Sequence, residues 1–472
     1  MAIKRWIASK DTTITNAFFE NLTTRARNSN MGASDVVEVF SIYAQASSAS
    51  VELSRALMEF PIEQVTAART AAEIPASGSV SYFIKLSNTP HSFTTPNTFY
   101  LTVQPVSRSW TEGSGLDMES YSDLGVASWY SASATTAWTT EGGDYHASPT
   151  YNSYFDTGVE DLELEITDLV EEWIAGTKSN NGIGIQLSSS LESAERSYYT
   201  KKLFGRGSEF FFKRPFLEAR WDSSIKDDRE NFYISSSLLP AEQNLNKLYL
   251  YNRFKGSLYN IPAAGTGSIY VSLYSSSAGS PTGSALTLYN GVSSVTGTYV
   301  STGIYSASLA VNSTVTTVQD VWHNNAGTQY FTGSAFEIKP HSNLDDYKLD
   351  DYVINVTNMK PIYSNTEVAR FRVFARPKDW QPTIYTVALN DIETTPIENA
   401  YYKILRVVDD YSVIPYGTGS SNHTLTSYDK EGNYFDLDMS MLETGYSYAI
   451  KFTFLQEGEY REQRESFKFR IE

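Results

Sequence analysis

Apolar and polar residues alternate along most of this 472-residue chain, and this period of two limits its fold more strongly than any other feature. Side chains of a β-strand point alternately to opposite faces, so alternation is typical of strands with one buried face. Clusters of Ser, Thr, Gly, Asn and Pro separate the runs, as turns separate short strands. The pattern predicts an all-β chain of sandwiches or barrels. The clearest alternating apolar positions are Val80, Tyr82, Ile84 and Leu86; Phe99, Leu101 and Val103; Ile269, Val271 and Leu273; and Phe371, Val373 and Ala375.

One window has helical periodicity instead. Between Glu160 and Gly176 the apolar residues fall roughly on one helical face. Gly176 is expected to end this helix, because glycine readily adopts the left-handed conformation found after a helix. The residues on the face are Leu164, Leu169, Val170, Trp173 and Ile174.

Length and two shifts in composition predict three domains. A chain of 472 residues is too long for one ordinary domain. The polar run at residues 221–229 follows an expected strand, and a second shift at 360–365 follows an acidic stretch at 344–351. We therefore predict domains at residues 1–222, 228–360 and 361–472.

Charge and cysteine content argue against several classes of function. Binding of nucleic acid needs Lys and Arg to displace counterions, so the net charge of −17 argues against it. The same net charge argues against a polybasic membrane anchor. No apolar window is long enough to span a bilayer, and the first residues lack the apolar core of a secretory signal. The chain has no cysteine, which removes disulfides, thiolate metal sites and thiol catalysis. We expect neither nucleic acid nor a membrane as a partner.

Catalytic motifs are not evident in the sequence. The five histidines have no metal-ligand spacing, and neither a G-x-S-x-G elbow nor a phosphate-binding P-loop occurs. Paired carboxylates such as Asp227-Asp228 and Asp409-Asp410 are adjacent in sequence, whereas a glycosidase needs two carboxylates that face each other across a cleft. We expect no enzyme activity and no cofactor. One alternative stays open, a structural Ca²⁺ held by oxygens near residues 343–351.

Six short motifs follow one another in the first 222 residues. They are Val51–Phe60; Val106–Gly115; Trp138 with Gly142-Gly143-Asp144-Tyr145; Leu164–Gly176; Asn181–Ile185; and Lys213–Glu218. In this order and spacing they resemble the DNRLRE-type jelly-roll module, which is related to carbohydrate-binding modules. The resemblance implies a jelly-roll sandwich for residues 1–222. It also implies a short helix from Thr167 to Gly176, with Asp168 in its first turn and Trp173 as a core plug.

Three tryptophans of this region admit two interpretations. Trp110, Trp129 and Trp138 are candidates for a glycan platform, because sugars stack on exposed aromatic rings. The simpler interpretation places the same rings in a hydrophobic core, where most tryptophans lie.

The later strands resemble immunoglobulin-like modules. Residues 247–253, 268–274 and 303–309 look like strands of an immunoglobulin-like sandwich. The stretch Leu442–Phe452 resembles fibronectin type III domains, with Thr444 in place of the usual proline. The resemblance implies a turn at Gly445 and a corner tyrosine at Tyr448.

A basic and aromatic strip lies within the last predicted domain, at residues 370–380. It is either an edge strand with solvated charges or a docking strip for an acidic neighbouring subunit, because Arg and Trp often anchor interfaces. We take Arg372, Arg376 and Trp380 as the candidate interface.

Tandem sandwiches of this composition resemble virion structural proteins of tailed bacteriophages. Residues 1–18 and 376–380 look like structural proteins of large marine phages. The resemblance implies a non-catalytic component of a virion, assembled from protein made in the host cytoplasm, in the neck or collar, a tail or baseplate appendage, or a head decoration or fibre. Its partners would be other virion proteins and further copies of itself. The alternative is a carbohydrate-binding adhesin that recognises a surface glycan through its first domain.

Overall fold

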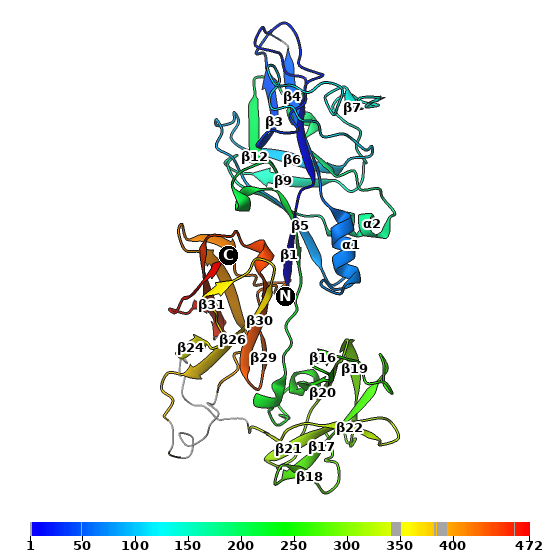
Figure 1. Ribbon diagram of the computed structural model, residues 1–472, viewed down its shortest axis with the longest axis vertical. Coiled ribbons are helices and arrows are strands. Elements are labelled where there is room, and N and C mark those ends of the chain that lie inside the picture. The colour runs from blue at the N-terminus through cyan, green and yellow to red at the C-terminus, as the bar shows by residue number, and fades with distance from the viewer. Residues whose placement is uncertain (1, 49, 341–350, 382–383, 385–393, 457) are drawn as a thin grey trace. The chain divides into compact units, whose positions relative to one another are not determined.

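The computed structural model describes every residue except 1, 49, 341–350, 382–383, 385–393 and 457 (Figure 1). The all-β class predicted from the alternation is confirmed. The described helices are few and short: α1 (Ile62–Thr70), α2 (Thr167–Ala175), α3 (Ser189–Glu192) and the 3-10 turns η1 (Phe211–Lys213), η2 (Asp228–Glu230), η3 (Ala241–Asn244) and η4 (Met439–Met441). None of the helices in these ranges is long and apolar enough to cross a membrane.

Two compact units make up the chain. The first contains Met1–Asp222 together with Thr418–His423 and Ser440–Gly445, and the second contains the remaining residues. Within the second unit, the strands between residues 246 and 337 and those between 352 and 471 belong to separate sheets. Three independently folding domains remain our proposal.

The first unit is a sandwich of two antiparallel sheets. Neighbouring strands are mostly not consecutive in sequence. One sheet has the order β1 (Ile3–Ile7), β13 (Phe216–Arg220), β5 (Ser81–Leu86) and β10 (Leu162–Glu165). The other has the order β12 (Tyr198–Phe204), β3 (Val36–Tyr43), β4 (Val51–Glu59), β11 (Ile183–Leu187), β6 (Phe99–Pro105) and β9 (Tyr151–Phe155), with β2 (Lys10–Thr15) paired to β4; β7 (Ser131–Ser133) and β8 (Thr136–Ala137) form a small hairpin.

Alternation along β5 and β6 places the predicted apolar positions in the core between the sheets. Tyr82, Ile84 and Leu86 of β5 are buried, and so are Phe99, Leu101 and Val103 of β6. The residues between them on β6 point to the outer face of the seven-stranded sheet.

The predicted helical window is half right. Residues 162–165 form strand β10, which pairs with β5, so the prediction of helix from Glu160 is wrong there. Pairing with the sheet overrides the local periodicity. Helix α2 begins at Thr167, has Asp168 in its first turn and ends before Gly176, whose φ of +71° is the predicted left-handed conformation. Helix α1 was not predicted, because its buried face consists of only Ile62, Val65 and Ala68.

In the second unit, strands up to residue 337 form one eight-stranded sheet around a single core. Both ends of the sheet contribute side chains to that core, which includes Leu248, Leu273, Tyr305 and Trp322, so the sheet folds over on itself. Its strands are β14 (Asn246–Tyr251), β20 (Ile304–Leu309), β19 (Val295–Ser301), β17 (Ile269–Ser277), β21 (Thr317–His323) and β22 (Gln329–Thr332), with β18 (Ser280–Thr282) paired to β17 and β23 (Phe336–Glu337) to β21; β15 (Arg253–Phe254) and β16 (Ser257–Leu258) form a separate hairpin.

The remaining strands form a second sandwich with an aromatic core. Tyr402 stacks on Phe435 with ring centroids 4.0 Å apart, and Phe371 contacts Phe469 at 5.8 Å across the two sheets. One sheet has the order β24 (Tyr352–Val356), β26 (Val368–Pro377), β30 (Gly432–Asp438) and β29 (Ser427–Asp429); the other has the order β25 (Ile362–Tyr363), β33 (Phe467–Ile471), β31 (Ser447–Gln456), β27 (Ala400–Arg406) and β28 (Tyr411–Ile414), with β32 (Glu459–Glu462) paired to β31.

Two details refine the sequence predictions for this sandwich. Gly445 has a φ of +87°, as the predicted turn requires, and Tyr448 is fully buried against Phe469. Strand β24 pairs with β26 although it precedes residue 361. The predicted boundary at 360/361 is therefore too late, because the sheet takes its first strand from the preceding segment.

Trp173 of α2 gives the first test. Its ring is 5% exposed within the main core of the first unit, which agrees with the predicted core plug. We expect Trp173→Ala to lower the free energy of unfolding by about 3–5 kcal/mol, because the lost ring leaves a cavity. Denaturant unfolding measures this, with Trp380→Ala as the control at a partly exposed position. An unchanged stability for Trp173→Ala would contradict the core assignment.

Candidate functional site

Loops within residues 106–148 cover part of the outer face of the seven-stranded sheet, and we call them the cap. A hydrophobic cluster separate from the main core fills the space between the cap and strands β2 and β4. Its buried members are Ile14, Leu57, Val106, Trp110, Ala127, Trp129, Ala132 and Trp138.

The cap buries all three tryptophans of the predicted glycan platform. Trp110 and Trp129 are 4% exposed and Trp138 is 6% exposed. The indole N–H of Trp110 donates to the carbonyl of Asn181 at 2.9 Å, and that of Trp138 donates to the carbonyl of Ser128 at 2.8 Å. A sugar stacks only on an accessible ring face, so the platform prediction is wrong for these residues. They hold the cap in place.

Arg55 on β4 joins the cap to the sheet. Its guanidinium makes a two-point ion pair with Glu192 at 2.7 and 2.9 Å, and a further N–H donates to the carbonyl of Gly142 at 2.9 Å. The rings of Trp129 and Tyr145 lie 5.3 and 5.7 Å from its central carbon. Burial alone would lower the pKa of Arg55, but its pKa is raised because Glu192 stabilises the charge.

The motif residue Glu112 braces the other side of the cap. Its carboxylate receives two hydrogen bonds from Arg206, at 2.8 and 2.6 Å, and one from the backbone N–H of Asp11. Nearby, the side chain of the fully buried Asn30 donates to the carbonyls of Glu112 and Ala127. The motifs that carry the family resemblance therefore have structural roles in this chain.

Beyond the cap, the same sheet face stays open along β6 and β9. Tyr100 and Tyr154 are cross-strand partners, 50% and 51% exposed, with ring centroids 4.9 Å apart. Beside them lie hydrogen-bonded polar side chains: Thr102 donates to Asn152, and Gln186 donates to Gln104. We call these six residues the tyrosine strip. Sequence reasoning missed it, although the alternation in Phe99–Pro105 already placed Tyr100 on the outer face.

A buried ammonium lies where oxygens converge. Lys201 of β12 is fully buried, and its Nζ donates to the side-chain oxygen of Asn88 at 2.8 Å and to the carbonyls of Gly158 at 3.0 Å and Glu160 at 2.5 Å. The ring of Phe155 lies 4.5 Å away. Burial lowers the pKa of Lys201 to about 8, against the opposing effect of Glu160 and Asp161.

The predicted calcium stretch, residues 343–351, lies outside the described residues except for Asp351, so that expectation stays a prediction. Within the described ranges, His, Cys, Asp and Glu side chains do not gather in groups of three or more that would suit a metal. The described histidines have local roles: the ring of His323, for example, contacts the hydroxyl of Ser272 at 2.9 Å.

The basic strip does not lie on an edge strand. β26 is flanked by β24 and β30, which corrects that alternative. Arg370 makes a two-point ion pair with Asp436, which raises the pKa of Arg370, and Arg372 pairs with Asp429 at 2.6 Å. These carboxylates neutralise two of the strip's cations.

Arg376 differs from the other two arginines of the strip. Its guanidinium lies 5.1 Å from the ring of Trp380, and the ion pairs of the described residues do not include it. Of the predicted interface residues, Arg376 and Trp380 are therefore brought together, whereas Arg372 is occupied by carboxylates.

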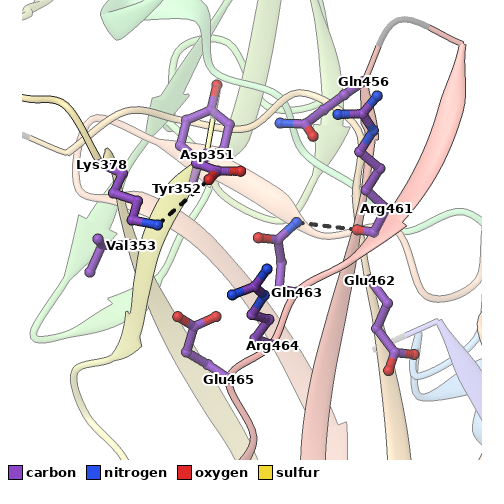
Figure 2. A pocket seen from close by; sticks show the side chains of 10 residues that line it. All are labelled: Asp351, Tyr352, Val353, Lys378, Gln456, Arg461, Glu462, Gln463, Arg464 and Glu465. Atoms are coloured by element: carbon purple, nitrogen blue, oxygen red, sulfur yellow. Dashed lines mark hydrogen bonds and ion pairs between the residues drawn. The ribbon is translucent and has the colours of Figure 1, made fainter. Parts of the chain in front are cut away.

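A hollow of about 260 Å³ opens beside the strip (Figure 2). Its lining is strongly polar and of mixed charge: Lys378 faces Asp351 at 3.6 Å, and Gln463 donates to the backbone of Arg461. Glu462 is held by Lys403 and Lys451. Ligand pockets are mostly apolar with few polar groups, so this hollow does not match that pattern. The lining residues are Asp351, Tyr352, Val353, Lys378, Gln456, Arg461, Glu462, Gln463, Arg464 and Glu465.

Two buried carboxylates share one arginine near the start of the second unit. Arg229 pairs with Asp227 and, at 2.7 Å, with the fully buried Asp320, which also accepts the indole N–H of Trp322. The pKa of Asp227 is raised from 3.8 to about 7, chiefly by burial; the neighbouring charge of Asp320 adds to this shift, and Arg229 opposes it.

No protein-family model matches this chain, and no curated protein matches it. Solved structures include three weak likenesses. The Yersinia pseudotuberculosis adhesin InvE is 12% identical over 48% of this chain and 54% of that chain, with a TM-score of 0.15. A trypsin-activated alpha-2-macroglobulin from Escherichia coli is 10% identical over 88% and 24%, with a TM-score of 0.16. A tetra-tandem repeat from the extending region of a large adhesion protein is 8% identical over 98% and 99%, with a TM-score of 0.15.

This chain spans about half of the adhesin structure and about a quarter of the macroglobulin. Likenesses at such low TM-scores support no conclusion about function.

Asp227 gives the protein a specific pH dependence. Its folded pKa of about 7 exceeds the ordinary 3.8, so between these values the folded state keeps a proton that the unfolded chain has lost. The stabilisation from this group is complete below about pH 4 and is lost as the pH rises through about 7. We expect Asp227→Asn to flatten this decline, which amounts to about 1–4 kcal/mol.

Urea unfolding between about pH 5 and pH 8 measures the slope. Asp410→Asn, in an exposed turn, is the matched control and should keep the wild-type slope. Equal slopes for Asp227→Asn and wild type would show that Asp227 is not the titrating group.

Proposed function

We propose that this chain is a non-catalytic structural protein of a tailed-bacteriophage virion, in which its β-sandwiches act as spacers and docking surfaces. One observation supports this most: several arginines of the described residues, with their carboxylate partners, act as internal braces. Arg55, Arg206 and Arg229 each hold carboxylates that come from distant parts of the chain. A nearby positive charge favours the ionised form of a carboxylate, so a carboxylate in such an ion pair is a weaker base.

The virion setting rests on the resemblance of residues 1–18 and 376–380 to phage structural proteins. It implies assembly from protein made in the host cytoplasm, with other virion proteins and further copies of this chain as partners. Closed homo-oligomers are the usual form of such components. The neck or collar, a tail or baseplate appendage, and a head decoration or fibre remain the candidate positions.

Arg376 and Trp380 form the part of the predicted interface that remains available for docking. Their stacked pair is partly exposed, whereas Arg370 and Arg372 are paired within the sheet. An acidic neighbouring subunit would neutralise the charge of Arg376 and cover the indole of Trp380.

Removal of this pair tests the proposal. Because neither side chain lies in the core, we expect Arg376→Ala with Trp380→Ala to leave folding intact and to block incorporation into particles. Quantitative immunoblotting of purified particles from a complemented phage measures incorporation. Arg470→Ala with Tyr460→Ala, two exposed positions of the same sandwich, is the control. Normal incorporation of the folded Arg376/Trp380 variant would contradict the docking role.

A second candidate function, recognition of a surface glycan, is supported by the tyrosine strip. Two adjacent exposed rings offer faces for pyranose stacking, and the amides and hydroxyl beside them can exchange hydrogen bonds with sugar hydroxyls. The strip has no ionisable side chain other than the tyrosine hydroxyls, so a neutral glycan suits it best.

Loss of the tyrosine rings tests this second function. On an array of neutral and acidic glycans we expect the wild type to bind neutral members, and Tyr100→Ala with Tyr154→Ala to lose about tenfold or more in affinity, because each stacked ring contributes on the order of 1 kcal/mol. Tyr121→Ala with Tyr460→Ala removes two exposed rings elsewhere and should have no effect. Binding retained by the Tyr100/Tyr154 variant, or none by the wild type, would contradict glycan recognition at the strip.

A further inference from the structure

The side chains of Lys201 and Asn88 meet where the two sheets of the first unit join. Asn88 follows β5 of the four-stranded sheet, and Lys201 lies on β12, at the edge of the seven-stranded sheet (Figure 1). The backbone beyond β5 pairs with β12: Asn88 is the partner of Leu203, and the N–H of Thr89 donates to the carbonyl of Lys202 at 2.9 Å. The two side chains therefore start from neighbouring backbone positions.

Lys201 is fully buried beside aromatic rings. The ring of Phe155 lies 4.5 Å from its Nζ and stacks on Phe99 at 5.2 Å. Buried lysines are usually paired, but the ion pairs of the described residues do not include Lys201. Burial disfavours the charged amine and lowers the pKa of Lys201 to about 8. At pH 7 about a tenth of the molecules therefore hold a neutral amine here, which is the nucleophilic form of lysine.

The oxygens around Nζ suit a neutral amine that faces the carboxamide of Asn88. A neutral amine has two N–H donors and one lone pair. The carbonyls of Gly158 at 3.0 Å and Glu160 at 2.5 Å can accept the two N–H groups, which leaves the lone pair for the third neighbour, Asn88, whose Oδ1 lies 2.8 Å from Nζ. Because a C=O bond is about 1.2 Å long, Cγ of Asn88 lies within about 4 Å of Nζ. This is close to the separation of about 3–3.5 Å from which bonds form.

His91 polarises the same carboxamide. Its Nε2 lies 3.2 Å from Oδ1 of Asn88 and 3.1 Å from the carbonyl oxygen of Gly158. Both oxygens can only accept, so this nitrogen carries a proton. A donor at Oδ1 stabilises the negative charge that this oxygen gains when Cγ is attacked. The backbone of Asn88 is also fixed, because its N–H donates to the carboxylate of Asp161 at 2.7 Å.

We propose that Lys201 and Asn88 join in an intramolecular isopeptide bond. Nζ of Lys201 attacks Cγ of Asn88, the Nζ–Cγ bond forms, and the Cγ–Nδ2 bond breaks. One proton passes from Nζ to Nδ2, and ammonia leaves. One amide replaces another, so the reaction needs neither an oxidant nor a cofactor. It occurs once in each molecule and acts on no external substrate. The inference therefore goes beyond the proposed function and does not depend on it.

The bond would link the two sheets of the first unit covalently. It joins positions 113 residues apart, one beyond β5 and the other on β12. The chain has no cysteine, so a disulfide cannot supply such a link. A crosslink that closes a long loop stabilises the folded state mainly by restricting the unfolded chain.

Intact-mass spectrometry of the purified, denatured chain tests the inference. We expect the wild type to be lighter than its sequence by one ammonia, completely so after incubation at about pH 9, where most of the Lys201 amines are neutral. A tryptic digest should contain residues 86–108 joined to residues 197–202, because trypsin does not cleave after a lysine whose amine is in an amide. Fragmentation of this species should place the bond between Asn88 and Lys201.

Variants of the two partners and of their neighbours complete the test. Lys201→Met and Asn88→Ala should each keep the full mass of their sequence. Lys202→Met is the matched control, since this neighbour on β12 pairs with Glu38 at 3.3 Å, and it should lose ammonia as the wild type does. His91→Ala should form the bond about tenfold more slowly or worse, so freshly purified protein should contain an unlinked fraction that decreases with time.

Two results would overturn the proposal. One is a wild type that keeps its full mass at about pH 9 and yields the two peptides separately; this measurement needs no variant to fold. The other is a loss of ammonia that persists in Lys201→Met, because the ammonia would then come from cyclisation of an asparagine on its own backbone.

Discussion

The ion pair between Arg55 and Glu192 is the interaction on which the architecture of the first unit most depends. Arg55 is 15% exposed, and it satisfies a carboxylate, a backbone carbonyl of the cap and two aromatic rings at once. Without it, the cap would lose its polar attachment to β4 and the carboxylate of Glu192 would remain buried without its partner, which is costly in a low-dielectric setting. Closure of the cap over Ile14 and Leu57 decides which part of this sheet face is available for binding. The tyrosine strip lies on a part of the face that the hydrophobic cluster under the cap does not include.

The same use of charge recurs in the second unit. Arg229 binds two buried carboxylates, and Glu462 is held by Lys403 and Lys451 together with the hydroxyl of Tyr416. Burial opposes ionisation of Glu462, but these hydrogen bonds keep its pKa at about 2. Charges that are paired with one another are less available for recognition. Arg376 takes part in none of the ion pairs of the described residues, and it is therefore the cation of the basic strip to which we assign a contact with a partner.

Much of the fold could be predicted from the sequence, because alternation and turn chemistry are local. The apolar positions of β5 and β6, the end of α2 at Gly176 and the burial of Trp173 all follow from patterns within a few residues. The site could not be predicted in this way. Arg55 and Glu192 are 137 positions apart, and Arg370 and Asp436 are 66 apart, so neither the closed cap nor the neutralised strip leaves a local signal. The tyrosine strip could have been predicted in part, since Tyr100 falls between two core positions of one strand.

The central claim is that Arg55, held by Glu192 of α3, ties the cap to β4, and a double-mutant cycle tests the ion pair that holds Arg55 most directly. Arg55→Met, Glu192→Gln and the double variant would be compared with wild type by urea unfolding, with the exposed pair Arg470–Glu472 as the reference. We predict a coupling energy of about 2 kcal/mol or more between Arg55 and Glu192, against about 0.5 kcal/mol or less for the exposed pair. A coupling energy for Arg55 and Glu192 no larger than that of the exposed pair would contradict the account.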